Sequence, residues 1–302
     1  MRGLQDLDYV LDKLAWMRDE RIWPNGLRYL WTDAFGVVLL ASLYEALRQQ
    51  KYLDEAVWVI AEVKRVLGRK RGIRIGEAPD RDGQYFHYLA MWLYALHVMG
   101  RYDPGYRQEA IALARDVHRA FVLPGHGVIW KMAEDLSAPY PGYGLGALDA
   151  FDGYVAYRLL DDEALAPEIA EMKDLIDATA GGLAISQDLG LGMMLWMTQF
   201  FPEEAWAQTQ RRRSLAMLDR MWMPQGYFCR EPYLPDVRIA FANYGVSVGL
   251  QAVDAMPERV ARLNTYFDAY RSGDAYDREA ITHVMSCNSH FPGLLLRDEP
   301  GP

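Results

Sequence analysis

The chain has 302 residues, 51% of them hydrophobic, and a net charge of −9, which fits one large domain or two average ones and allows a sizeable core. The acidic balance excludes a nucleic-acid-binding protein with a basic face, and two cysteines, Cys229 and Cys287, exclude a disulfide framework. No apolar run reaches the ~20 residues that cross a bilayer, and the first residues lack the apolar core of a signal peptide, so we expect a cytoplasmic protein without a membrane partner.

Amphipathic helices are predicted at six places along the chain. Leu53, Ala56, Ile60 and Val63 form one apolar stripe at helical spacing, with charged residues on the opposite side. A stripe of this kind predicts a helix with one buried face. The six predicted amphipathic helices cover residues 5–19, 53–67, 106–121, 163–176, 203–220 and 257–271.

A second set of helices is apolar on nearly every side, which predicts burial on every side. The last of them is interrupted by Pro292-Gly293. These helices alternate with the amphipathic ones and are predicted at residues 34–47, 85–99, 145–160, 189–200, 239–253 and 280–296.

Six buried helices that alternate with six amphipathic ones indicate an all-α fold, an (α/α)6 toroid of six helical hairpins. No linker or low-complexity segment interrupts the repeat, so residues 1–302 are predicted to form a single domain. The glycine-rich segment 125–131 is expected to form a short β-hairpin at the rim.

A polar cluster precedes or opens each of the apolar helices. Helix N-termini leave free N–H groups and carry partial positive charge, so they favour carboxylates and hydroxylated ligands. If the six helix starts face one funnel, the clusters converge into a single site. They begin near Trp31, Asp80, Gly146, Ser186, Ala242 and Ser286.

Asp82, Asp149 and Asp33 are the candidate catalytic acids. Asp82 lies in the densest cluster, where acids, an amide, phenols and an imidazole occur within nine residues. Asp149 and Asp152 are three residues apart and share one face of an otherwise apolar helix, where carboxylates are costly unless they line a wet cavity or pair with a cation. Asp33 is the third choice, although a helix N-cap explains it equally well.

The remaining candidates are residues that would bind the substrate. Aromatic rings would stack on it, while amides, acids and bases would hold its hydroxyl groups. Cys229, Cys287 and His290 offer a Cys2His zinc set, but buried structural cysteines are the better interpretation, and we expect no metal or cofactor. The predicted binding residues are Trp31, Gln84, Tyr85, His87, Trp130, Lys131, Asp152, Asp188, Arg230, Glu231, Asn243, Tyr244 and His290.

Four segments resemble the six-hairpin glycosidase-like superfamily, and most closely a poorly characterised branch of it. They are Trp31–Gly36, Asp82–Tyr88, Trp130–Met132 and Asp152–Leu160. The superfamily includes inverting glycosidases, unsaturated glucuronyl hydrolases and sugar 2-epimerases. The resemblance therefore implies an (α/α)6 fold and a small-molecule sugar or glycoside as substrate, without fixing the reaction or the oligomeric state.

The leading hypothesis is glycoside hydrolysis, in which Asp82 and Asp149 serve as the acid and the base. A sugar epimerase or isomerase is an alternative that would use His87 and His290 as bases. A lyase or cyclase of natural-product biosynthesis and a non-catalytic sugar-binding protein also remain open, because a fold does not imply a function.

Overall fold

The computed structural model of the protein describes residues 3–222 and 239–296. Within these residues it contains twelve α-helices and only two-residue β-strands, so the predicted all-α class is confirmed. The chain divides into two compact units: Leu27–Gly181, termed the α2–α7 unit, and Met1–Gly26 together with Gly182–Pro302, termed the α8–α12 unit, to which α1 also belongs. The number of domains is not decided by this division, and the single domain stays a prediction.

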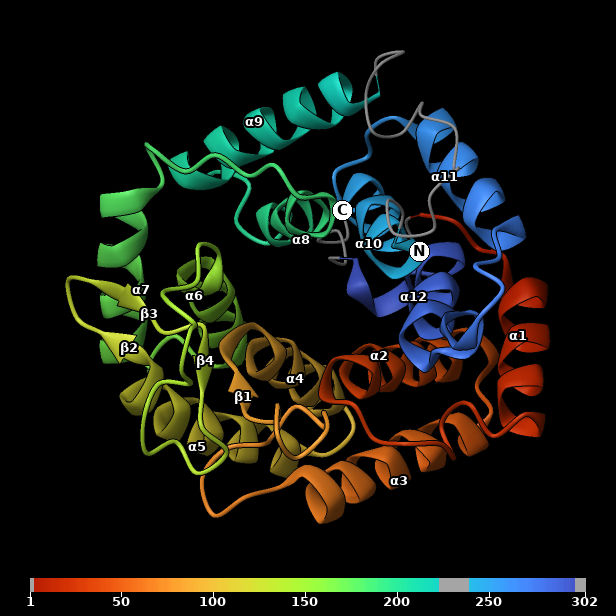
Figure 1. Ribbon diagram of the computed structural model, residues 1–302, viewed down its shortest axis with the longest axis horizontal. Helices are drawn as coiled ribbons and strands as arrows, with labels where there is room; N and C mark the ends of the chain where they lie inside the picture. Colours follow the sequence, from red (N-terminus) through yellow and green to blue (C-terminus); the bar gives the residue numbers. More distant parts are fainter. Residues whose placement is uncertain (1–2, 223–238, 297–302) are drawn as a thin grey trace. The chain divides into compact units, whose positions relative to one another are not determined.

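The α2–α7 unit consists of three helical hairpins. Each buried helix packs against its amphipathic partner, α2 against α3, α4 against α5 and α6 against α7, and α4 also packs against both α2 and α6. Figure 1 shows α3, α5 and α7 on one side of the row formed by α2, α4 and α6. The helices are α2 (Leu30–Leu47), α3 (Gln50–Leu67), α4 (Phe86–Met99), α5 (Pro104–Phe121), α6 (Asp149–Leu160) and α7 (Ala166–Thr179).

Helix α2 is the one helix of the described residues that is long and apolar enough to cross a membrane. However, 78% of its length is buried inside the protein. Its apolar residues are therefore accounted for by packing against α3 and α4, as in the core helix of a folded domain.

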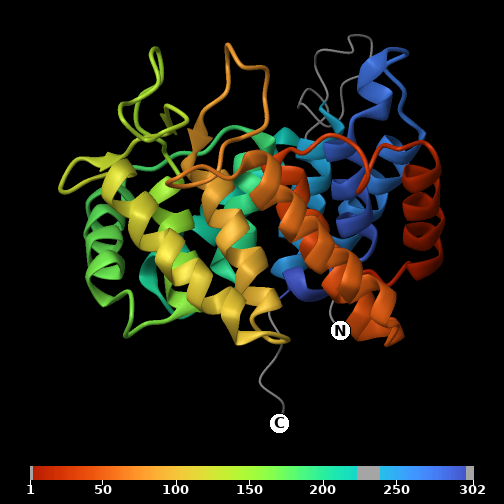
Figure 2. The ribbon, with the colours of Figure 1, turned by 90° about the horizontal axis from the view of Figure 1, so that it is seen from below.

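Two short antiparallel ladders lie at the end of this unit where α4 and α6 begin. β1 (Gln84–Tyr85) pairs with β4 (Lys131–Met132), with Tyr85 opposite Lys131. β2 (Val122–Leu123) and β3 (Gly127–Val128) form a hairpin that overlaps the predicted one. Figure 2 shows the loops that carry these strands protruding together beyond the helices of the unit.

The α8–α12 unit also has three buried and three amphipathic helices. α10 packs against α8, α11 and α12, while α9 covers α8 and α1 covers α12. The 3₁₀-helix η3 (Ala275–Arg278) precedes α12, and η4 (Gly293–Leu295) follows it. The α-helices are α1 (Leu7–Asp19), α8 (Asp188–Thr198), α9 (Ala205–Met221), α10 (Ala240–Ala252), α11 (Pro257–Ala269) and α12 (Ala280–His290).

Glycines allow α8 and α10 to approach each other closely. A Cβ atom on Gly192 would lie 2.4 Å from the carbonyl oxygen of Gly245, and one on Gly249 would lie 2.1 Å from the carbonyl oxygen of Gly192. Any side chain at these positions would force the two backbones apart. The contact explains why two largely apolar helices of this unit contain glycine, which otherwise weakens a helix.

All twelve predicted helices are present, with two informative differences in their bounds. α6 begins at Asp149 rather than at residue 145, because the backbone of Gly144 and Gly146 bonds to the 128–130 segment. α12 ends at His290, before Pro292 and a left-handed Gly293 with φ of 48°. In both cases a competing backbone interaction or a helix-breaking pair shortens a helix that the apolar pattern extends.

Candidate active site

Asp82 anchors the loop that precedes β1. Its carboxylate forms a close ion pair with Arg74 and accepts hydrogen bonds from the backbone N–H groups of Gly76 (3.2 Å) and Gly83 (2.8 Å). The Asp82 side chain is fully buried. These contacts give Asp82 a structural role, and its catalytic role stays a prediction that they do not favour, because a reacting acid needs access to the substrate.

Gln84 and Lys131 are likewise engaged in holding the loops. The Gln84 side chain donates to the carbonyl oxygens of Arg71 (3.0 Å) and Glu134 (2.7 Å) and accepts from the N–H of Ile73 (2.8 Å). The Lys131 ammonium donates to the carbonyl oxygen of Arg81 at 2.6 Å. It also lies over the rings of Tyr85, Tyr140 and Tyr143, at 4.3–5.0 Å from their centroids. Both side chains are buried, which leaves them little freedom to bind a hydroxylated ligand.

Asp33 and Trp31 lie in the first turn of α2. Asp33 pairs with Arg28 at 3.1 Å and accepts from the backbone N–H of Tyr29 at 3.2 Å, so it neutralises a buried guanidinium and stabilises the start of the helix. Trp31 is also buried, but its indole Nε1 has no hydrogen-bond partner among residues 3–222 and 239–296. Its ring contacts His87 and Tyr88, at centroid distances of 5.9 and 5.2 Å.

His87 and Trp130 are brought together by strand pairing. The backbone N–H of Phe86 donates to the carbonyl oxygen of Trp130, next to the β1–β4 ladder. The Trp130 indole then donates to His87 Nδ1 at 3.2 Å, so this nitrogen carries no proton in the bonded form. Trp130 is 40% exposed and lies near Tyr85 and Tyr143, and together these rings form a partly open aromatic surface.

Asp149 stands at the start of α6, beside His87. Its Oδ1 is 3.8 Å from His87 Nδ1, and no described residue offers it a hydrogen bond, although the atom is buried. Its Oδ2 lies against the backbone of Gly146, where a Cβ atom would come within 1.8 Å of it. A buried carboxylate oxygen that lacks a donor is uncommon and calls for an explanation such as catalysis or an absent ligand.

Asp152 lies one turn further along α6, on the same face as Asp149. Burial raises the pKa of Asp152 well above its ordinary value, and the negative charge of Asp149 raises it further. Asp152 is therefore protonated under conditions in which an ordinary aspartate is ionised. Two nearby carboxyls, one kept protonated, are the arrangement that acid–base catalysis requires.

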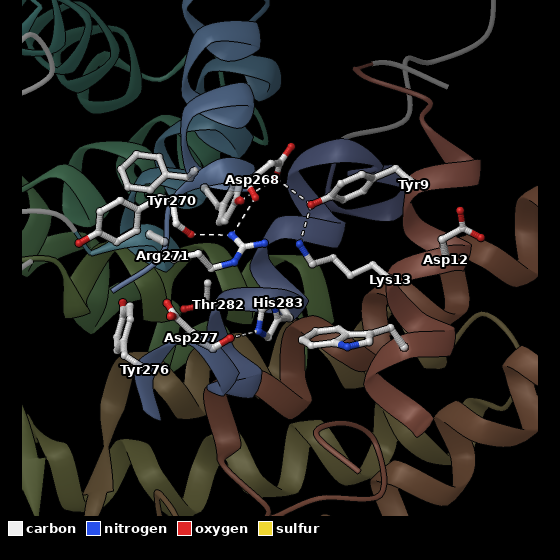
Figure 3. Close-up of a pocket in the computed structure, with 14 residues that line it drawn as sticks. Tyr9, Asp12, Lys13, Asp268, Tyr270, Arg271, Tyr276, Asp277, Thr282 and His283 are labelled. Atoms are coloured by element: carbon white, nitrogen blue, oxygen red, sulfur yellow. Dashed lines mark hydrogen bonds between the residues drawn. The ribbon is translucent and has the colours of Figure 1, made fainter. Parts of the chain in front are cut away.

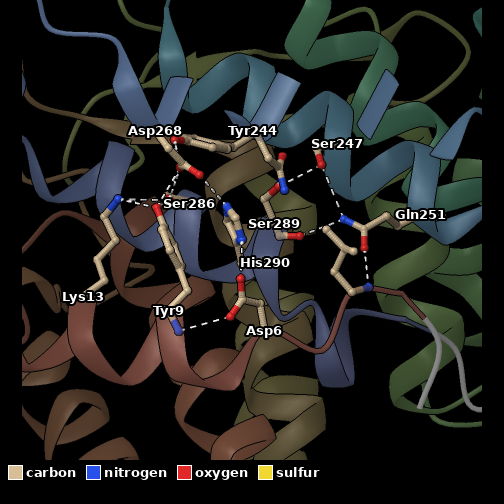
Figure 4. Close-up of polar contacts among 12 residues, drawn as sticks. Asp6, Tyr9, Lys13, Tyr244, Ser247, Gln251, Asp268, Ser286, Ser289 and His290 are labelled. Atoms are coloured by element: carbon tan, nitrogen blue, oxygen red, sulfur yellow. Dashed lines mark hydrogen bonds and ion pairs between the residues drawn. The ribbon is translucent and has the colours of Figure 1, made fainter. Parts of the chain in front are cut away.

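In the α8–α12 unit, two predicted site residues belong to a saturated polar network centred on Asp268. Asp268 accepts hydrogen bonds from Tyr9 and Tyr244 (both 2.7 Å) and from His290 Nε2 (2.8 Å), and His290 Nδ1 lies 3.5 Å from Asp6. Figure 4 shows these side chains from α1, α10, α11 and α12 pointing toward one another. Tyr244 is buried and bonded through its hydroxyl, so its ring does not form the exposed stacking surface expected from the sequence.

Asp188 and Asn243 meet between α8 and α10. The Asn243 amide donates to Asp188 at 3.2 Å and to the carbonyl oxygen of Ile239 at 2.9 Å. The predicted residues Arg230 and Glu231 and the candidate zinc ligand Cys229 lie outside the described residues. Among residues 3–222 and 239–296, no group of three or more His, Cys, Asp or Glu side chains is arranged to hold a metal ion.

Tyr9, Lys13 and Asp268 itself belong to the Asp268 network but were not among the residues predicted from the sequence. Tyr9 and Lys13 are one turn apart on α1, and Lys13 donates to the Tyr9 hydroxyl (2.6 Å) and to Ser286 (3.1 Å). A signal was available, because Tyr9, Lys13 and Trp16 occur at positions i, i+4 and i+7 and so share one face of α1. A stripe of large polar and aromatic residues on one face of an amphipathic helix indicates contacts beyond simple solvation.

The chain was compared with known proteins. No protein-family model matches it, and no curated protein matches it significantly in sequence. Solved structures are similar over most of the chain. A D-mannose isomerase aligns with a TM-score of 0.66 and 11% identity, covering 95% of this chain and 96% of the isomerase.

Two further solved structures are similar. A GH76 α-mannanase from Bacteroides thetaiotaomicron aligns with a TM-score of 0.64 and 11% identity, covering 94% of each chain. A cellobiose 2-epimerase from Bacillus thermoamylovorans aligns with a TM-score of 0.52 and 11% identity, covering 85% of this chain and 74% of the epimerase. Identity this low shows the fold alone. These structures share the predicted (α/α)6 fold, which the likeness shows for this chain.

Proposed function

We propose that the protein is a glycoside hydrolase whose reacting carboxyls are Asp149 and Asp152. The proposal rests on the position of these two carboxyl groups, one turn apart on α6. One carboxylate oxygen of Asp149 is buried without a donor, and Asp152, one turn away, has a raised pKa. The sugar-processing names of the similar structures, an α-mannanase among them, support the carbohydrate class.

In this mechanism Asp152 protonates the glycosidic oxygen as the bond to the anomeric carbon breaks. Asp149 then acts as the carboxylate that attacks the anomeric carbon or activates water, and water supplies the new hydroxyl group of the sugar. Residues three apart on a helix have Cβ atoms about 5–6 Å apart. A carboxyl separation of about 5–5.5 Å would give the double displacement of a retaining enzyme, and one of about 6.5–9.5 Å the single displacement of an inverting one.

The side chains around the pair supply binding and orientation. The exposed face of Trp130 and the rings of Tyr85 and Tyr143 offer a platform for a sugar ring. The unpartnered Nε1 of Trp31 is a buried donor close to His87. In this proposal Asp82, Gln84 and Lys131 hold the loops that position the platform.

A sugar isomerase or epimerase is the second candidate, and the position of His87 favours it. His87 Nδ1 lies 3.8 Å from Asp149, so an imidazole and a carboxylate are available to move a proton between carbon and oxygen. His290, the other base expected from the sequence, lies between Asp6 and Asp268 and is engaged by both.

Two parallel assays with mannose compounds distinguish the hydrolase from the isomerase. The full chain is incubated with 4-nitrophenyl α-D-mannoside and, separately, with D-mannose in D2O; mannose is chosen because two of the similar structures are named for mannose chemistry. Hydrolysis releases nitrophenol, and the hydrolase proposal predicts this release without deuterium entering a sugar carbon. Deuterium incorporation without bond cleavage, lost in His87→Gln, would overturn it in favour of the isomerase.

A further inference from the structure

The α8–α12 unit contains a cavity of about 390 Å³ that the proposed hydrolysis does not use. It is lined by residues of α1, α10, α11, the segment after α11, η3 and the start of α12 (Figure 3). A volume in this range accommodates a small molecule of one or two sugar rings. The side chains that line the cavity indicate which kind of molecule it binds.

Two cations face each other across this cavity. Figure 3 shows the Lys13 ammonium and the Arg271 guanidinium pointing toward one another. Arg271 donates to the backbone carbonyl oxygens of Asp268 (2.9 Å) and Tyr270 (2.6 Å), and Lys13 donates to two hydroxyls. Neither cation forms an ion pair with a carboxylate of the described residues. The Asp268 carboxylate instead contacts His290, at 2.8 Å.

The proximity of the two cations has an energetic cost. Burial lowers the pKa of Lys13, and the positive charge of Arg271 adds to this lowering, against the opposing influence of Asp268. An anion placed between the two groups would convert their repulsion into two charge-assisted hydrogen bonds. The fork of the guanidinium matches the two oxygens of a carboxylate.

His283 adds an acceptor to the same cavity. Its Nε2 donates to the carbonyl oxygen of Asp277 at 2.9 Å, while Nδ1 is buried without a hydrogen-bond partner in the part of the chain that the structure describes. Burial and the nearby Lys13 charge lower the pKa of His283 to about 4, so the ring is neutral. A neutral Nδ1 can accept a hydrogen bond from a ligand hydroxyl.

Other residues of the lining restrict the ligand further. The half-exposed ring of Trp16 offers an apolar face. Asp12, Asp268 and Asp277 also line the cavity, and their charges disfavour a doubly charged phosphate more than a singly charged carboxylate. The lining therefore combines an anchor for one negative charge, a hydroxyl acceptor and a surface for a ring.

We propose that this cavity binds a sugar acid of about hexuronate size, with its carboxylate between Lys13 and Arg271 and a hydroxyl group on His283 Nδ1. The proposal rests on residues of the α8–α12 unit alone. It does not depend on hydrolysis at Asp149 and Asp152, and either proposal can fail without the other.

The test is calorimetric titration of the full chain with three probes. D-glucuronate and D-glucose differ only by a carboxylate in place of a hydroxymethyl group, and D-glucose 6-phosphate adds a dianion. Glucuronate is expected to bind at least about tenfold more tightly than glucose. Its affinity is expected to fall as salt is added. Equal binding of glucose and glucuronate, tighter binding of the phosphate, or no binding of glucuronate would each overturn the proposal.

Variants locate the binding. Arg271→Gln removes a largely exposed side chain that bonds only to backbone carbonyls, so the fold should tolerate it, and glucuronate affinity should fall to that of glucose. Arg278→Gln is the matched control, an exposed arginine that pairs with Glu20 and does not line the cavity, and it should leave affinity unchanged. Undiminished glucuronate binding in Arg271→Gln would place the ligand elsewhere and overturn the assignment.

Discussion

Asp149 of the α2–α7 unit and Asp268 of the α8–α12 unit are both acids at the centre of polar clusters, yet their surroundings differ. Asp268 accepts hydrogen bonds from two tyrosines and a histidine, whereas Asp149 Oδ1 accepts none. A saturated cluster stabilises a fold, while an unsatisfied buried acceptor calls for an explanation such as a catalytic role or a bound ligand. The contrast separates a structural network from a candidate reaction site.

The pKa values of the two clusters shift in opposite directions. Burial alone would raise the pKa of Asp268, but hydrogen bonds from His290, Tyr244 and Tyr9 outweigh it and hold the pKa below its ordinary value. The Asp152 carboxyl is desolvated, accepts no hydrogen bond from any described residue and faces the charge of Asp149, so its pKa is raised. The same residue type is thus held ionised in one cluster and protonated in the other.

The largest predicted effect is the loss of turnover in Asp152→Asn. Removal of a general acid should lower kcat/KM by about 10²–10⁴-fold, measured by nitrophenol release. The melting temperature should stay the same or rise, because a buried carboxyl beside a like charge is removed. Asp177→Asn on the exposed surface of α7 is the control, and a matching loss of activity there would discredit the assignment.

Gly146→Ala tests the positioning of Asp149. The new Cβ would stand 1.8 Å from the present place of Asp149 Oδ2 and must displace the carboxylate. A displacement of about 1 Å can cost about 10²-fold in rate. We expect kcat to fall while thermal unfolding changes little. Gly144→Ala, which has no neighbour within 4 Å of the new Cβ, should keep its activity.

His290→Gln should weaken the fold without affecting turnover. It removes the imidazole that lies between Asp6 and Asp268, and loss of a hydrogen bond to a charged group costs about 1.5–3 kcal/mol of unfolding free energy. Urea denaturation measures this change. A collapse of turnover in a variant that remains folded would return His290 to the catalytic residues and revive the isomerase candidate.

The smallest effects are those of pH on stability. The pKa of Asp268 is lowered by folding, so its contribution is present above the unfolded-state value of about 3.9 and is lost as the pH falls through the folded value. The pKa of Asp152 is raised, so stability decreases as the pH rises from about 3.9 through its folded value. The unfolding free energy of Asp268→Asn should no longer fall as the pH is lowered into the acid range. That of Asp152→Asn should no longer fall as the pH rises above about 3.9. If the pH dependence in either variant equals that of the parent protein, the corresponding pKa shift is contradicted.

The fold was largely predictable from the sequence, because apolar and amphipathic helices differ in periodicity. The site was less so. Asp149 and Asp152 were chosen as candidates because carboxylates on an apolar helix are anomalous. Asp82 resembles them in sequence, and only its contact with Arg74 reveals its structural role. Asp268 was overlooked because an acid near the end of an amphipathic helix is ordinary until its partners from distant helices are known.

A direct test of the account measures turnover and melting temperature together for Asp149→Asn and Asp268→Asn. The account predicts that Asp149→Asn loses turnover and melts like the parent protein, whereas Asp268→Asn melts several degrees lower and keeps its turnover at temperatures where it is folded. The reverse result, an active Asp149→Asn and a stable but inactive Asp268→Asn, would contradict it.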